Sequence, residues 1–313
     1  MKRLWVAFLS TACTFVPERA CESHLECVDA FGPGTTCDAA GQCILATRPI
    51  PAGCEGIEGP IGVSEAVTDD EVWGCPITYR VDGVVEITGS LSVSSGATIE
   101  MGPRAALVVD AGGALDVTGA PDLPVVFTSP SGASAGSWAG IVVTETAGPV
   151  AIVDAMVQSA GGALSDRLSP DEEAGIVVLG SATVRRTTIV DSAAHGIRFA
   201  RGGTPVEFAD NTFIETALAP IRIDANEVDR LNGGHTFDEG AVIEVDATVV
   251  DHEATWIDLD VPYRLLTVGP EEGLAIGSPV AERAVLTVTE GVDLQLEPGS
   301  GIYVGFDGPA GFI

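Results

Sequence analysis

The sequence contains a single lysine, few aromatic residues and no long hydrophobic run. Lys2 is the only lysine among the 15 Lys and Arg residues. Asp and Glu together number 45, so the formal net charge is −30. A surface of this charge repels nucleic acid and anionic lipid headgroups, and we expect neither as a partner. No stretch approaches the roughly 18 uninterrupted apolar residues of a transmembrane helix. Apolar residues nevertheless make up 46% of the chain, too many for a disordered acidic protein.

The N-terminus has the layout of a short export signal. Lys2 and Arg3 precede an apolar run over residues 4–9, and small residues lead to Cys13. Ser-Thr-Ala-Cys at 10–13 resembles a lipobox, where a bacterial lipoprotein is cleaved and lipidated, although Leu9 lies one place too far upstream. We predict an export signal over residues 1–12, lipidation of Cys13 and a location at the outer membrane or cell surface. The alternative is plain secretion into the medium after cleavage nearby.

All seven cysteines lie between residues 13 and 75. An odd number in an exported protein needs an explanation, and a lipidated Cys13 leaves six for disulfides in an oxidising compartment. The predicted disulfide cysteines are Cys21, Cys27, Cys37, Cys43, Cys54 and Cys75. We expect the first four to staple a Cys-rich segment within residues 13–48 and the last two to bridge the start of the next domain, although other pairings stay open. Zinc is not expected, because the short gaps hold five residues instead of two to four.

Residues 49–76 are rich in Gly and Pro and are predicted to be a linker and cap. From Ile77 onward, short runs of Val, Ile and Leu alternate with polar residues and are separated by Gly. Period two dominates and helical periodicity is absent, so the sequence predicts many short strands in a sandwich, a barrel or a coiled β-solenoid.

An internal repeat favours the solenoid. Gly175-Ile-Val-Val178, Gly196-Ile-Arg-Phe199 and Pro220-Ile-Arg-Ile223 begin similar units 21 and 24 residues apart. Between them, the units starting at Val157, Val190 and Ile214 are interpreted as equivalent, each with a turn residue three positions ahead: Asp154, Thr187 and Asn211. This period fits a coil of three short strands, in which stacked inward side chains form apolar columns.

Four phrases in the same region carry a resemblance to a known family. They are Gly96-Ala-Thr-Ile-Glu-Met-Gly102-Pro103, Gly113-Ala-Leu-Asp-Val-Thr-Gly119, Pro124-Val-Val-Phe-Thr-Ser129 and Trp138-Ala-Gly-Ile141. Their order and spacing resemble the opening of bacterial right-handed parallel β-helix proteins of the pectin-lyase-like superfamily, apart from the reversed order of Gly102 and Pro103. The resemblance implies an all-β, right-handed parallel β-helix over residues 77–313. Trp138 is expected to cover the side of a coil. Strand-like residues continue to Ile313 with no polar cap, so we expect either a truncated chain or end-to-end stacking on another chain.

The resemblance also raises the question of catalysis, because enzymes of this superfamily cleave acidic polysaccharides or glycosides. The candidate cluster is Asp191, His195, Arg198, Glu207 and Asp210, with Asn211 beside it. His195-Gly-Ile-Arg198 is similar to the Gly-His-Gly and Arg-x-Lys elements of polygalacturonases, but Ala194 replaces the first Gly and no Asp-Asp pair stands at the expected interval. Asp191 and Asp210 are expected to lie near one another on adjacent coils. A polar residue at every second place is also what an exposed strand face looks like, and we expect a solvated face.

Acidic loops offer a weak calcium candidate at Asp171, Glu172 and Glu173, because loop carboxylates and carbonyls can supply the oxygens that calcium needs. No EF-hand loop and no nonapeptide array occurs.

Taken together, the sequence features predict a non-enzymatic protein of the cell envelope with a structural, adhesin-like or binding role, whose partner is an extracellular polysaccharide or a surface protein. The alternative is a polysaccharide-acting lyase or hydrolase.

Overall fold

The computed structural model describes residues 35–37, 42–45, 59–130, 134–267, 273–277, 283–305 and 310–312. It divides the chain into two units, Met1–Arg48 and Pro49–Ile313. In the first unit, β1 (Thr35–Cys37) pairs antiparallel with β2 (Cys43–Leu45), and Cys37 stands opposite Cys43. The export signal, Cys13, Cys21, Cys27 and Cys54 lie outside the described residues, and their roles stay predictions.

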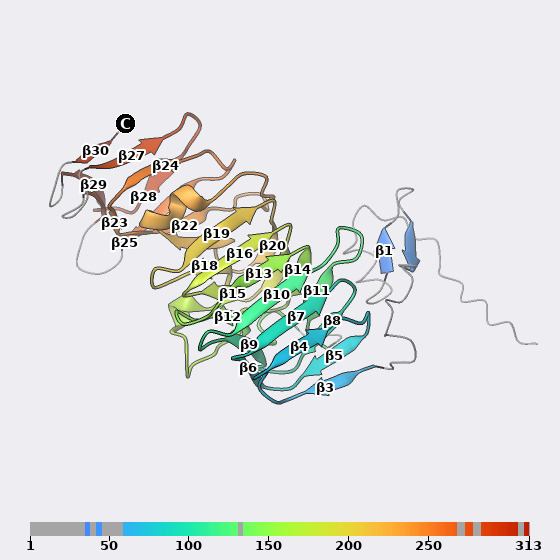
Figure 1. The fold of residues 1–313 in the computed structure, drawn as a ribbon. Coiled ribbons are helices and arrows are strands. Elements are labelled where there is room, and N and C mark those ends of the chain that lie inside the picture. The colour runs from blue at the N-terminus through green and yellow to red at the C-terminus, as the bar shows by residue number, and fades with distance from the viewer. Residues whose placement is uncertain are drawn as a thin grey trace, which may run out of the picture. The chain divides into compact units, whose positions relative to one another are not determined.

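The second unit is a parallel β-helix, as predicted, and its strands stack in chain order from β3 to β30 (Figure 1). Three long sheets run along it, and we name each sheet by the number of its strands among the described residues. The six-stranded sheet contains β4 (Asp70–Trp73), β7 (Ser90–Ser94), β10 (Ala114–Thr118), β13 (Val150–Val153), β16 (Ser181–Arg185) and β19 (Thr204–Ala209). The seven-stranded sheet contains β3 (Ile61–Val63), β5 (Thr78–Val81), β8 (Thr98–Met101), β11 (Val125–Thr128), β14 (Ala155–Gln158), β17 (Thr188–Ser192) and β20 (Thr212–Thr216). The nine-stranded sheet contains β6 (Val84–Ile87), β9 (Ala106–Val109), β12 (Gly140–Val143), β15 (Ala174–Val178), β18 (His195–Phe199), β21 (Ile221–Asp224), β22 (Ile243–Ala247), β25 (Tyr263–Thr267) and β28 (Leu294–Leu296).

Each coil from β4 to β21 visits the six-, seven- and nine-stranded sheets in turn, which confirms three short strands per coil. The predicted repeat is confirmed in the nine-stranded sheet, where Ile176, Ile197 and Ile221 align in one column. In the seven-stranded sheet, Val190 aligns with Ile214 as predicted, but its partner on β14 is Gln158. The expected equivalence with Val157 was therefore wrong by one residue.

Parallel pairing begins at β3, ahead of the predicted start at residue 77. Cys75, which lies between β4 and β5, is disulfide-bonded, in agreement with its place among the predicted disulfide cysteines. The pairing of the six cysteines stays a prediction.

A short helix interrupts the stack after β21. The 3₁₀ segment η2 (Ala225–Arg230) packs between β19 and β24, where the next strand of the six-stranded sheet would otherwise lie. Beyond it, two three-stranded sheets replace the six- and seven-stranded ones, while the nine-stranded sheet continues through β21 and β22. The new sheets consist of β23 (Val249–Val250), β26 (Gly273–Ile276) and β29 (Gly301–Val304), and of β24 (Glu253–Trp256), β27 (Ala284–Val288) and β30 (Ala310–Phe312).

Inward Val, Ile, Leu and Phe side chains form one continuous core along the coils. Trp138 lies inside this core with no exposed surface, and its indole N–H donates to the Gln158 carbonyl at 2.8 Å. The expectation that Trp138 covers the side of a coil was wrong, because the turn before β12 directs the ring inward.

Two buried polar residues support the turn that leads into the seven-stranded sheet. The Asn211 side chain accepts from the Thr187 N–H at 3.0 Å and donates to the Val184 carbonyl at 2.9 Å. The Thr187 hydroxyl lies 3.2 Å from the Ile152 carbonyl, one coil further back. These side chains satisfy backbone groups that the turn leaves without strand partners. The stacked turn positions predicted at Thr187 and Asn211 are confirmed, whereas Asp154 aligns with Arg186.

Candidate functional site

The outer face of the nine-stranded sheet changes from apolar to charged along the stack. One outward column runs through Val108, Val142 and Val177 and continues with Arg198, Arg222 and Glu244. Residues 159–173, which we call the strap, form the connection between β14 and β15. The strap's Leu164 and Leu168 bury the apolar part of this face, so only the charged part can offer polar chemistry.

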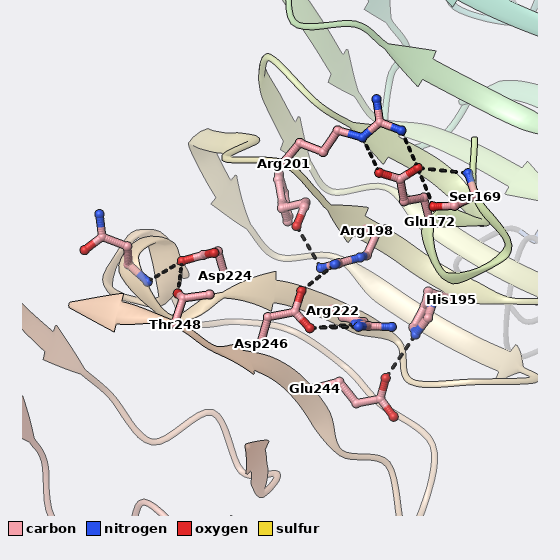
Figure 2. Close-up of polar contacts among 12 residues, drawn as sticks. Ser169, Glu172, His195, Arg198, Arg201, Arg222, Asp224, Glu244, Asp246 and Thr248 are labelled. Atoms are coloured by element: carbon pink, nitrogen blue, oxygen red, sulfur yellow. Dashed lines mark hydrogen bonds and ion pairs between the residues drawn. The ribbon is translucent and has the colours of Figure 1, made fainter. Parts of the chain in front are cut away.

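The strap is held by ion pairs at two points. Glu172 is buried, and both of its carboxylate oxygens accept from Arg201, at 2.5 and 2.7 Å. Ser169 donates its backbone N–H to the same carboxylate at 2.9 Å and closes a capping box around the 3₁₀ turn η1 (Pro170–Glu172) (Figure 2). Burial alone would raise the pKa of Glu172, but the bonds from Arg201 and Ser169 outweigh it, and the pKa lies below its usual value. At the other point, Arg167 pairs with Glu86.

Five residues on three strands form what we call the polar cluster: His195, Arg198, Arg222, Glu244 and Asp246 (Figure 2). Asp246 on β22 lies between two guanidinium groups and bonds with Arg198, which is itself buried. The other oxygen of Asp246 accepts from Arg222 at 2.8 and 2.9 Å. Burial lowers the pKa of Arg198, although the Asp246 carboxylate opposes that effect. The pairing satisfies three charged groups that would be costly to bury alone.

His195 is buried and bridges the strap to β22. Its Nδ1 lies 3.2 Å from the Glu173 carbonyl, and its Nε2 lies 3.0 Å from the Glu244 carboxylate. The hydrogen bond from His195 lowers the pKa of Glu244. Glu244 therefore stays ionised at neutral pH, and a carboxylate in that state cannot deliver a proton as a general acid.

The structure brings together only part of the predicted catalytic set. His195 and Arg198 share β18, whereas Glu207 lies on β19 and pairs with Arg185 at 2.8 Å on the exposed surface. Asp191 accepts from the Ser159 hydroxyl at 2.8 Å, and Asp210 begins a different turn.

The expectation that Asp191 and Asp210 are neighbours on adjacent coils was wrong. The register of β17 and β20 aligns Arg186 with Asp210 and Asp191 with Glu215, so the two aspartates occupy different turns. All four residues have positive φ, as the left-handed turn positions of these coils require. Sequence reasoning also missed Glu244, which lies 49 residues from His195, and Asp246, which lies 48 residues from Arg198.

The calcium candidates on the strap have separate environments. Glu172 is neutralised by Arg201, the Ser169 hydroxyl lowers the pKa of Asp171, and burial raises the pKa of Glu173. Within the described parts of the chain, no three His, Cys, Asp or Glu side chains converge as metal ligands.

We expected no Gly-x-Ser-x-Gly elbow, but the residue pattern itself does occur at residues 132–136. In hydrolases this pattern places a nucleophilic serine on a turn from a strand to a helix. Here the next element along the chain is the strand β12, so the pattern does not have the setting of a nucleophile elbow.

A shallow hollow of about 640 Å³ lies on the outer face of the six-stranded sheet. Its lining includes the small side chains of Ala114, Ala151 and Ser181 and the exposed Val206. Of the described residues that line it, Asp116 is the single one with a carboxyl group. Among the described residues, the lining thus supplies one carboxyl group, whereas glycoside hydrolysis uses a pair.

His235 is a neutral histidine within an aromatic group. It packs against Phe208 and Phe213, and its Nδ1 accepts from the Asn211 N–H at 3.2 Å. Burial lowers the pKa of His235 to about 4. Because the unfolded chain binds this proton near pH 6.5, stability is full above that pH and falls as the pH drops towards 4.

We expect protonation of His235 to lower the free energy of unfolding by on the order of 3 kcal/mol between pH 6.5 and pH 4. This figure follows from about 1.4 kcal/mol for each unit by which the pKa is lowered. Urea unfolding of the wild type and of His235→Gln at several pH values measures this loss, since Gln can still accept from Asn211. An equal loss of stability in both proteins would show that His235 is not responsible.

Among the described residues, no helix is both long and apolar enough to span a bilayer. A family model described as the pectate-lyase like beta helix domain matches residues 65–165. The match covers β4 to β14, with the coils whose phrases carried the predicted resemblance. Neither the curated proteins nor the solved structures include a match to the chain. The matched model and the parallel sheets together support a parallel β-helix similar to pectate-lyase-like domains.

Proposed function

We propose that this chain is a non-catalytic, exported β-helix protein with a structural or binding role at the cell envelope. The observation that carries the proposal is the internal pairing of the polar cluster. Asp246 is held by Arg198 and Arg222, and Glu244 is held by His195. The cluster joins β18, β21, β22 and the strap, and so it acts as a structural fastening.

The charge balance argues against an enzyme that cleaves acidic polysaccharides. Such an enzyme needs positive groups free to bind the carboxylates of its substrate. Here the guanidinium groups of Arg198, Arg201 and Arg222 are each paired with a carboxylate of the same chain. A net charge of −30 further repels an acidic polymer.

The envelope location is supported by the predicted export signal of residues 1–12 and by the lipobox-like sequence that ends at Cys13. The partner that we propose is an extracellular polysaccharide or a surface protein, bound by exposed faces of the coils.

Incubation of the purified chain with polygalacturonate and with alginate, each with and without calcium, tests the absence of catalysis. We expect no unsaturated products and no new reducing ends above the level of Glu244→Gln. We also expect the purified protein to bind saturably to intact host cells that lack it. In a separate fractionation experiment, the Cys13→Ser variant should appear in the medium, whereas the wild type should stay in the membrane fraction. Product formation that is lost in Glu244→Gln would overturn the proposal in favour of the enzyme.

A further inference from the structure

His252 lies where the long sheets give way to the three-stranded ones. It follows β23 and directly precedes β24, and its ring faces η2. The contacts between η2 and β24 join the coils before and after this change of sheets. A group that fastens η2 at this place therefore controls how firmly the later coils hold to the earlier ones.

Both ring nitrogens of His252 face oxygen acceptors. Nδ1 lies 3.1 Å from the Asn226 side-chain oxygen and 3.3 Å from an Asp251 carboxylate oxygen, while Nε2 lies 3.2 Å from Asp229. The Asn226 atom is an acceptor, since it also accepts from the Asp251 N–H at 3.0 Å. A neutral imidazole has one N–H and one lone pair, so only the imidazolium can donate in both directions.

The groups around His252 carry an excess of negative charge. On η2, Arg230 pairs with Glu227 at 2.7 Å, which leaves Asp229 for His252. One oxygen of Asp229 is buried and has no hydrogen-bond partner. Asp251 and Glu253 flank His252 in the chain, and Asp224 closes β21 beside η2, where it accepts from Thr248 at 2.6 Å. A proton on His252 therefore removes repulsion among these carboxylates as well as adding a second hydrogen bond.

We propose that His252 is a proton-dependent clasp, which as an imidazolium binds η2 through Asp229 and Asn226 and releases it on losing its proton. Release accompanies the loss of the ring proton, because the neutral ring can no longer donate in both directions. The pH effect is opposite in sign to that of His235, whose protonation destabilises the fold. In an exported protein this clasp lets the pH of the medium change the firmness of the junction.

Amide hydrogen exchange of the full chain at pH 5.5 and pH 8.0 tests the clasp, after correction for the intrinsic pH dependence of exchange. We expect the protection of the η2 and β23 amides to fall about fivefold at the higher pH, the size of a partly exposed ion pair of about 1 kcal/mol. The amides of β9 and β12 serve as an internal reference. ¹⁵N NMR should show both His252 ring nitrogens protonated at pH 5.5.

Two variants separate the clasp from a general loosening. His252→Gln should give low protection at both pH values, and His252→Arg should give pH-independent protection because its charge is permanent. His235→Gln is the matched control and should keep the pH dependence of η2. Unchanged wild-type protection between the two pH values, or a pH dependence that persists in His252→Gln, would overturn the proposal.

Discussion

Replacing Asp246 with Asn should destabilise the protein by roughly 3–5 kcal/mol, the usual cost of removing one partner from a buried ion pair. The carboxylate is buried between the guanidinium groups of Arg198 and Arg222, at bond lengths of 2.8 and 2.9 Å to the latter. Asn keeps the shape of the side chain but leaves the buried charge of Arg198 and the half-buried charge of Arg222 without their carboxylate. The measurement is urea unfolding followed by circular dichroism.

The matched control for Asp246→Asn is Glu207→Gln, which breaks the exposed pair with Arg185 and should cost about 0–1 kcal/mol. A triple variant, Arg198→Met with Arg222→Met and Asp246→Leu, should recover most of the loss, because an apolar replacement buries no charge. A cost for Asp246→Asn no larger than that of the control would show that the polar cluster does not fasten the coils.

Trp138→Ala is expected to cost about 3–5 kcal/mol, because the ring fills the core and truncation leaves a cavity. Trp138→Phe should cost less, since most of the buried area remains. It should still lose about 1–3 kcal/mol, because the Gln158 carbonyl no longer receives the indole N–H.

Unfolding of both Trp138 variants should be followed by circular dichroism, because fluorescence changes when a tryptophan is removed. Val72→Ala is the surface control, since Val72 is 69% exposed and its truncation should change stability by about 0.5 kcal/mol or less. A Trp138→Ala variant as stable as Val72→Ala would contradict the placement of Trp138 in the core.

The coil itself could be predicted from the chain alone. Alternation of apolar and polar residues determines which side chains of a strand point inward, and equivalent strands recur at the interval seen between Ile176, Ile197 and Ile221. Turn residues at Thr187 and Asn211 carry the same information, because their side chains bond to backbone groups at the turn. For these reasons the fold class and the local register of the middle coils follow from short-range pattern.

Only the tertiary structure decided which outward residues meet. In the sequence, the outward positions all follow the same alternating polar pattern. No local feature of that pattern indicates that His195 contacts Glu244 or that Arg198 contacts Asp246. Their meeting depends on connections of irregular length, such as the strap and η2, which shift the position of each later coil along the sequence. The same cause misplaced Asp191 beside Asp210, because a shift of a few residues in a turn moves a side chain to another column. Inward packing is therefore determined by a period of two, whereas the partners on the outer face are determined by the three-dimensional course of the connections.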